Sequence, residues 1–144
     1  MGLKYLPYIK SPKDLKNYSK KELEAISSEL REYIISTVSE IGGHLASTLG
    51  VIELTTVLHY IYNAPDDKIV WDTGHQAYAH KVLTGRFESL NTIRKYKGLN
   101  PFLKQSESEY DVFGAGHAST SISAALGIAV ARDLNNQNFK VISI

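Results

Sequence analysis

Cysteine is absent from the 144 residues of this chain, and the sequence contains only four prolines and one tryptophan. Without cysteine the chain can form no disulfide bond, no thiolate nucleophile and no cysteine-ligated zinc site. No apolar run approaches the roughly 20 residues that a membrane-spanning helix needs. The opening stretch MGLKYLPYIKSPKDLK also lacks the apolar core of a signal peptide. We therefore expect a cytoplasmic protein with no membrane partner.

An excess of charge of one sign is also missing. Sixteen Lys and Arg against fifteen Asp and Glu give a net charge of +1. Proteins that bind nucleic acid are usually strongly basic, so we expect no nucleic-acid partner. Hydrophobic residues make up 43% of the chain and charged residues 22%, which is typical of a globular domain of about this length.

The first strong structural signal lies near the N-terminus. Prolines interrupt residues 1–18, which we expect to form an irregular arm. The tetrad Ser19-Lys20-Lys21-Glu22 then has the pattern of a capping box at a helix start. Apolar residues recur at three- and four-residue steps over residues 23–38, which predicts an amphipathic helix of about 20 residues ending at Gly42-Gly43. Residues 19–144 are expected to form the domain itself.

Beyond this helix the pattern alternates between helix and strand. We expect helices over Leu49–Tyr62, Tyr78–Leu83, Leu90–Tyr96 and Ser119–Leu134, strands over Lys68–Asp72 and Phe139–Ile144, and a loop over residues 97–118. The first of these helices is apolar nearly all round, which predicts that it is buried. Such alternation is typical of an α/β domain whose parallel sheet is flanked by helices. Because the chain stops directly after an apolar strand, we expect that it is truncated there.

The segment GGHLAS links the first two predicted helices and carries His44. An imidazole titrates near neutral pH, so His44 is a candidate for donating or accepting a proton. The alternative is a histidine that only caps a helix carbonyl. The residues by themselves leave both interpretations open.

A second candidate segment, Trp71–His80, follows a predicted strand, where ligands commonly bind in such sheets. His75 and His80 are five residues apart and not the four that place two zinc ligands on one helix face, so we expect no metal site here. His75 is instead a candidate for a phosphate contact. Asp72 is expected either to orient a histidine or to cap the helix that follows.

A third segment, GAGHASTS over residues 114–121, opens the long C-terminal helix. Its glycines let the backbone approach a ligand closely, and the unpaired amides of a helix start suit a diphosphate. The alternative is a plain loop with a Ser or Thr cap. The match to a dinucleotide-binding G-x-G-x-x-G pattern is incomplete, because Ser119 replaces the last glycine and no strand precedes it.

Two further features have simple explanations. Glu107, Glu109 and Asp111 are close enough in sequence to bind a cation, but a solvated loop explains them as well. His59 lies inside an apolar helix, where a packed histidine is expected.

Taken together, these segments resemble 1-deoxy-D-xylulose-5-phosphate synthases. The strings GGHLASTLGVIELTTVLHYIYNAPDDKIVWDTGHQAYAHKVLTGR and ESEYDVFGAGHASTSISAALGIAVARDL carry the resemblance, which runs from about Leu30 to the C-terminus. It implies a partial thiamine-diphosphate-binding domain of the transketolase type. It also implies an enzyme that joins pyruvate to D-glyceraldehyde 3-phosphate with loss of CO2, for isoprenoid, thiamine and pyridoxal synthesis. The implied cofactors are thiamine diphosphate and Mg²⁺, and the implied assembly is a homodimer.

The resemblance also implies roles for individual residues. His44 matches a histidine near the reacting carbons, Ser47 lies beside it as a substrate contact, His75 matches the histidine that contacts the cofactor diphosphate, and Gly116, His117 and Ala118 match a cofactor-binding triplet. The family usually has Ser where this chain has Ala118. That difference removes a hydroxyl contact, worth about 1 kcal/mol, and leaves any backbone contact unchanged.

The magnesium ligands of the family belong to a Gly-Asp-Gly motif with a later Asn, which we expect beyond residue 144. We therefore predict no metal ligand within this chain and no catalysis by the chain alone. The alternatives are one subunit of a split thiamine-diphosphate enzyme and a non-catalytic remnant.

Overall fold

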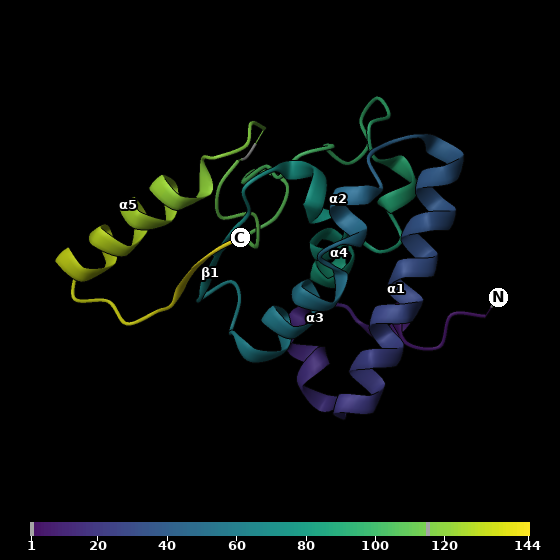
Figure 1. Cartoon of the computed structure of the whole chain (residues 1–144). Coiled ribbons are helices and arrows are strands. Elements are labelled where there is room, and N and C mark those ends of the chain that lie inside the picture. The colour runs from purple at the N-terminus through teal and green to yellow at the C-terminus, as the bar shows by residue number, and fades with distance from the viewer. Residues whose placement is uncertain (1, 115) are drawn as a thin grey trace.

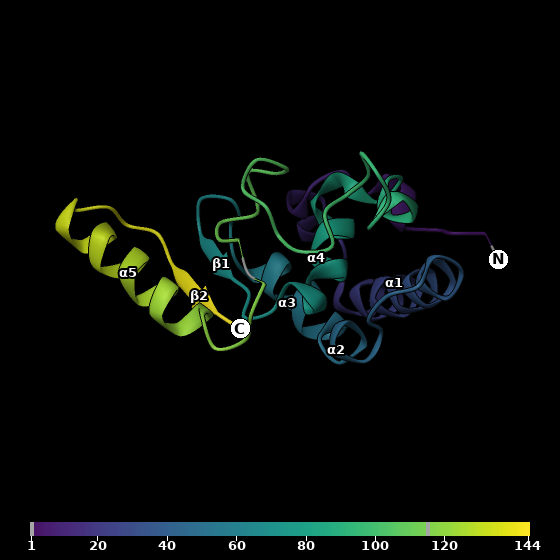
Figure 2. The ribbon, with the colours of Figure 1, turned by 90° about the horizontal axis from the view of Figure 1, so that it is seen from above.

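The computed structural model describes residues 2–114 and 116–144. Met1, in the predicted arm, and Ala115, in the GAGHASTS segment, lie outside the described residues. The helices and strands are α1 (Lys20–Ile41), α2 (Ala46–Leu49), α3 (Ile52–Ile61), β1 (Lys68–Val70), α4 (Tyr78–Lys81), α5 (Ser121–Leu134) and β2 (Val141–Ser143). Short 3-10 or π-helical turns cover Leu6–Tyr8, Pro12–Asn17, Gly74–Ala77, Val82–Arg86 and Leu90–Thr92. Helices α1 to α4 gather at one end of the molecule and α5 lies at the other, with the strands between them (Figures 1 and 2).

Helix α1 begins and ends where the sequence predicts. The Ser19 hydroxyl accepts the Glu22 N–H, and the Glu22 carboxylate accepts the Ser19 N–H at 2.8 Å. This capping box satisfies two amides that would otherwise lack partners at the helix start. At the other end the cap residue Gly42 has a φ of 76°, which glycine adopts without strain. The predicted first helix is confirmed.

One apolar core joins α1, α3, α4 and the N-terminal segment. Leu30 and Ile34 of α1 are completely buried, at the four-residue step that the sequence predicts. Helix α3 packs along α1, and α4 packs against both. The N-terminal segment adds three buried side chains to the same core, Leu6, Ile9 and Leu15.

The N-terminal segment contains two 3-10 helices where its prolines predict an irregular arm. Each proline lies at the first or second position of its helix, where a missing N–H costs no hydrogen bond. The Glu29 carboxylate of α1 accepts the N–H groups of Tyr5 at 3.0 Å and Leu6 at 2.9 Å. These bonds attach the segment to α1. The domain boundary that we place at residue 18 stays a prediction.

Two helix predictions are corrected by the structure. The helix predicted over Leu49–Tyr62 is present as α3, which begins later, at Ile52, because α2 ends at Leu49. The prediction that it is buried all round is wrong, because Leu54 is 45% and Ile61 57% exposed, and periodicity cannot show which residues of an apolar helix remain exposed. In residues 90–96, only Leu90–Thr92 forms a 3-10 turn, because Arg94 takes a positive φ of 67° that ends any helix.

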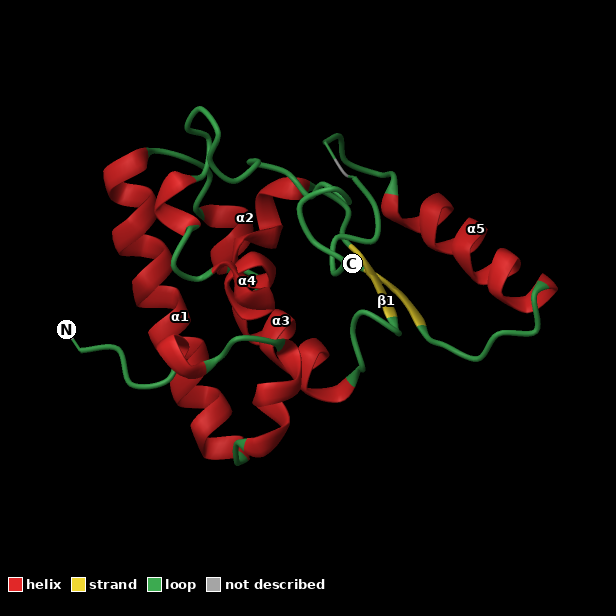
Figure 3. Cartoon of the chain, turned by 180° about the vertical axis from the view of Figure 1, so that it is seen from behind, coloured by secondary structure: helices red, strands yellow, loops and turns green. Residues whose placement is uncertain are grey.

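Strands β1 and β2 pair in parallel, as the alternation of elements predicts, with Ile69 opposite Ile142. Helix α5 is the last helix of the long connection between them and packs on both strands (Figure 3). Ile69 and Trp71 are buried in a second, smaller core that Ile142 helps to cover. The described residues therefore form a mixed α/β structure with a two-stranded parallel sheet.

Among the described helices, none is long and apolar enough to cross a membrane.

Candidate functional site

His44 and His75 meet at the surface, although they are 31 positions apart in the sequence. Their ring centroids lie 3.9 Å apart, with the ring planes inclined by 53°. His44 follows the end of α1, and His75 lies in the 3-10 turn that follows β1. Among the described residues no hydrogen bond joins either imidazole to a protein group, so both rings have nitrogen atoms available for a ligand.

The turn that carries His44 depends on Gly43. Its φ of 150° is a conformation that other residues rarely adopt. A Cβ atom there would lie 3.4 Å from the Tyr78 hydroxyl oxygen and 3.7 Å from Nη1 of Arg94. The glycine therefore lets the turn approach both side chains. Sequence reasoning missed Arg94, because a single arginine after a 3-10 turn has no local signature of a site.

Three effects lower the pKa of His75. The largest is partial burial, which disfavours the charged imidazolium, and the nearby His44 and the Arg94 guanidinium add to it. Partial burial also raises the pKa of Tyr78. His75 is therefore mostly neutral at pH 7, and one ring nitrogen can donate a hydrogen bond while the other accepts one.

Other predicted site residues are exposed. Ser47 lies in α2, which packs against the turn that carries His75. Gly116, His117 and Ala118 are exposed in the loop before α5. Among the described residues no hydrogen bond or ring contact joins them to the histidine pair, so their membership of one site stays a prediction.

Asp72 caps a helix, but not the one that follows it in sequence. Its carboxylate accepts the Ser119 N–H at 2.6 Å and the Ser121 hydroxyl at 3.0 Å, and so caps the start of α5. These hydrogen bonds lower the pKa of Asp72. The expectation that Asp72 orients a histidine or caps its own following helix is wrong. The Ser119 amide, just before α5, therefore already has an anionic partner.

Asp72 also joins the end of the sheet to this loop. Its N–H donates to the Ile144 carbonyl at 2.8 Å, which continues the strand pairing past β1. The carboxyl ends of both strands and the start of α5 therefore meet at one edge, where ligands bind in open α/β sheets. The predicted place of the site is consistent with this arrangement.

A second polar feature of the molecule is a largely buried network of charged side chains. Arg86 donates to Asp111 at 2.8 and 2.9 Å and to Glu107 at 2.9 Å, and Lys81 donates to Glu107. Both interpretations of the acidic segment, a cation site and a solvated loop, are wrong for Glu107 and Asp111, because their carboxylates pair with protein cations. No local sequence pattern predicts this pairing, since the partners lie 21 to 26 positions apart.

The pKa values of the two carboxylates reflect this pairing. Burial alone would raise the pKa of Glu107, but hydrogen bonds from Lys81 and the Asn100 amide hold it below its ordinary value. Burial would likewise raise the pKa of Asp111, and His80 and Arg86 together hold it far below the usual range. Both groups are therefore ionised at neutral pH.

His59 and His80 extend the network and are fully buried. His59 Nε2 lies 2.9 Å from His80 Nδ1, and His80 Nε2 lies 3.3 Å from the Asp111 carboxylate. Because a carboxylate only accepts, we assign the proton of neutral His80 to Nε2 and that of His59 to its own Nε2. Burial is the main cause that lowers both pKa values. His59 is thus packed, as predicted.

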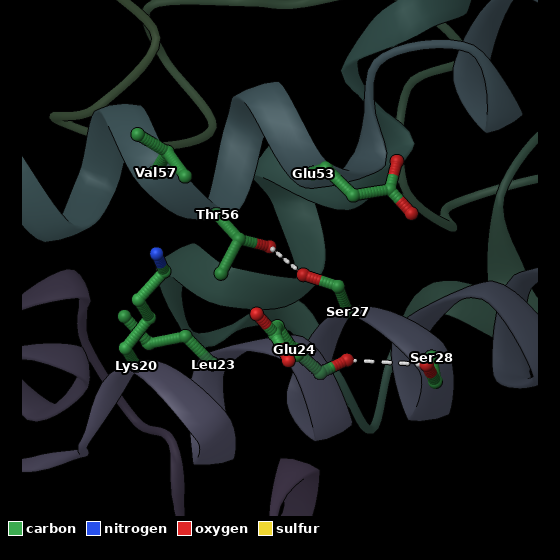
Figure 4. Close-up of a pocket in the computed structure, with 8 residues that line it drawn as sticks. All are labelled: Lys20, Leu23, Glu24, Ser27, Ser28, Glu53, Thr56 and Val57. Atoms are coloured by element: carbon green, nitrogen blue, oxygen red, sulfur yellow. Dashed lines mark hydrogen bonds between the residues drawn. The ribbon is translucent and has the colours of Figure 1, made fainter.

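A groove between α1 and α3 is not part of this site. Leu23, Ser27, Thr56 and Val57 contribute to its lining, and the Ser27 hydroxyl donates to Thr56 Oγ1 at 3.1 Å (Figure 4). None of the predicted site residues lines it. No cluster of three or more His, Asp or Glu in residues 2–114 and 116–144 is arranged to hold a metal ion.

Comparison with known proteins identifies one family. A family model described as 1-deoxy-D-xylulose-5-phosphate synthase matches residues 6–144. A protein of that name from Alkaliphilus oremlandii is 55% identical over 141 residues, which cover 98% of this chain and 23% of the relative. Proteins of the same name from Dictyoglomus turgidum and Syntrophotalea carbinolica are 56% and 57% identical over 139 residues, 96% of this chain and 22% of each relative.

The chain thus spans between a fifth and a quarter of the length of these relatives. Within that span the match is nearly complete and includes the turns that carry His44 and His75. A model that matches this much of the chain, together with relatives more than half identical, shows the family. The chain belongs to the 1-deoxy-D-xylulose-5-phosphate synthase family.

Proposed function

We propose that this chain supplies part of the thiamine-diphosphate site of a synthase that condenses pyruvate with D-glyceraldehyde 3-phosphate to 1-deoxy-D-xylulose 5-phosphate and CO2. The single observation that carries the proposal is the surface pair of His44 and His75 at the ligand-binding edge of the sheet. The relatives are named as synthases of this product. The protein that acts is a homodimer of chains that are longer than this one.

The donor set beside the pair fits an anionic cofactor in part. No hydrogen bond from a described residue occupies the His75 ring nitrogens, and the Arg94 guanidinium adds positive charge nearby. The exposed Gly116, His117 and Ala118 would add backbone and imidazole contacts to the diphosphate. The Asp72 carboxylate at the start of α5 opposes an anion, so we propose no contact to the Ser119 amide.

When bound, thiamine diphosphate supplies the carbon nucleophile and electron sink that the reaction needs, with Mg²⁺ on its diphosphate. His75 would hold the diphosphate through an N–H donor. His44, exposed beside it, would donate or remove a proton at a substrate oxygen. Ser47, on α2, would contact the substrate. The ligands of Mg²⁺ would come from outside these 144 residues, and the chain alone would make no product.

Titration of the chain with inorganic pyrophosphate, followed by NMR of the imidazole protons, tests the site. We expect weak binding that shifts the signals of His75 and His117, and a clear loss of affinity in His75→Gln. His59, which is fully buried, serves as an internal control whose signal should not move. If millimolar pyrophosphate leaves the His75 and His117 signals unchanged, the proposed diphosphate site is wrong.

A further inference from the structure

The loop that contains Phe102 contacts the histidine pair at His75. Phe102 of this loop packs edge-on against His75, with ring centroids 5.0 Å apart and planes inclined by 76°. His75 therefore contacts two aromatic rings, those of Phe102 and His44. An edge-to-face pair of this kind is favourable and fixes the orientation of the ring. Because no hydrogen bond to a described protein group holds the His75 imidazole, this packing is what orients it.

Both ends of the segment that carries Phe102 are held by carboxylates. The Asn100 N–H donates to Glu107 at 2.7 Å, and the Lys104 N–H donates to Asp111 at 3.0 Å. Between them the Phe102 N–H donates to the side-chain oxygen of Asn100 at 3.2 Å. The backbone is thus fixed two residues before Phe102, two residues after it, and at Phe102 itself.

The two carboxylates are in turn held by one arginine. Arg86 bridges them through its planar guanidinium, and Lys81 adds a second cation on Glu107. The position of Arg86 depends on the preceding Gly85, which has a φ of 87°. A Cβ atom added to Gly85 would lie only 2.8 Å from the Lys10 carbonyl oxygen. Any larger residue would push the chain away from this approach and displace the Arg86 backbone.

Burying this network costs free energy, and its role in holding the loop accounts for its presence. Two cations and two anions are removed from water, and buried ion pairs generally stabilise a fold no more than apolar side chains of the same volume. What they supply is directionality, because each carboxylate accepts one backbone N–H while Arg86 holds both at a set spacing. The backbone groups that the two carboxylates hold belong to the loop between Asn100 and Lys104.

We infer that Phe102 is the positioning residue of His75, and that Glu107 and Asp111, bridged by Arg86, are the groups that hold it in place. The inference rests on the proposed function only for what His75 binds. The placement of the ring is a property of this chain and can be measured without any ligand. A failure of the inference and a failure of the proposed function are therefore distinguishable.

The imidazole proton signal of His75 in the ligand-free chain, assigned with His75→Gln, is the measurement. The aromatic ring of Phe102 shifts this signal, and burial, to which the contact with Phe102 contributes, is the largest cause of the lowered pKa of His75. In Phe102→Leu, which keeps an apolar side chain, the signal should move toward that of a free imidazole. The pKa of His75 should rise toward its ordinary value. An unchanged signal and pKa in this variant overturn the role of Phe102.

The support of the loop is tested by Glu107→Gln and Asn100→Ala. We expect both to change the His75 signal in the same direction as Phe102→Leu does. The matched control is Glu109→Gln, because Glu109 is an exposed acid of the same segment. If Glu107→Gln does not fold, Asn100→Ala still decides, since it removes the acceptor of the Phe102 N–H without changing a buried charge. A loss of thermal stability in Glu107→Gln with an unchanged His75 signal would show a merely structural network and overturn the inference.

Discussion

Two histidine pairs lie in this small structure, and they differ in what surrounds them. His59 and His80 are fully buried, hydrogen-bonded to each other at 2.9 Å, and connected to the Asp111 carboxylate. His44 and His75 lie at the surface, with ring centroids 3.9 Å apart and no hydrogen bond to a described protein group. In the first pair three of the four imidazole nitrogens have partners within the protein, with His59 Nδ1 the exception, whereas in the second pair the nitrogens are available to a ligand.

The comparison separates structural histidines from candidate functional ones by their partners. A buried polar group must find a hydrogen bond within the protein, because leaving it unpaired costs about 1–3 kcal/mol. A surface imidazole finds water at no such cost, so its nitrogens remain exchangeable for a phosphate or a substrate oxygen. The interior pair is therefore expected to determine stability and the surface pair to determine binding.

The largest expected effect comes from removing the anion that completes the interior pair. Asp111→Ala leaves the Arg86 guanidinium half-paired and the His80 N–H without an acceptor. We expect the free energy of unfolding to fall by about 3–5 kcal/mol, because an uncompensated buried charge is left behind. Urea unfolding measures it. Glu109→Ala, in the same segment, should change stability by less than about 0.5 kcal/mol.

A smaller effect is expected from acid. His59 and His80 have lowered pKa values in the fold, mainly because burial disfavours the charged ring, and ordinary values near 6.5 in the unfolded chain. Below pH ~6.5 the unfolded chain therefore binds more protons than the folded one, and stability decreases as the pH falls. The stabilisation is fully present above that pH.

The slope of this loss is up to about 1.4 kcal/mol per pH unit for each such histidine. Urea unfolding at several pH values between 5 and 7.5 measures this slope. His59→Gln should lower the slope by the contribution of one histidine. A free energy of unfolding that stays constant across this range would contradict the assignment of a neutral interior pair.

The smallest effect is expected at the surface pair. His75→Gln removes no hydrogen bond to a described protein group, so we expect the free energy of unfolding to change by less than about 0.5 kcal/mol. The same variant should weaken pyrophosphate binding. A large loss of stability in His75→Gln, comparable to that in Asp111→Ala, would remove the distinction between the two pairs.

Most of the regular structure follows from local signals. The capping box at Ser19 and the glycines after residue 41 predict the ends of α1, because they act within one helical turn. The apolar runs that become β1 and β2 predict parallel strands around α5. Predictions are wrong where the outcome depends on the far side of an element, as for the exposed side of α3, or on a single backbone angle, as at Arg94.

The sequence by itself determined the family, the order of the main helices and strands, and which histidines merit attention, because each of these is written in short strings of neighbouring residues. Only the tertiary structure decided how the histidines pair. It brings His75 to His44 and His80 to His59, and it places Asp72 at the start of α5, 47 positions away from its partner Ser119. The physical reason is that hydrogen bonds, ring contacts and burial depend on distance in space, and spacing along the chain does not encode that distance for partners that lie on different elements.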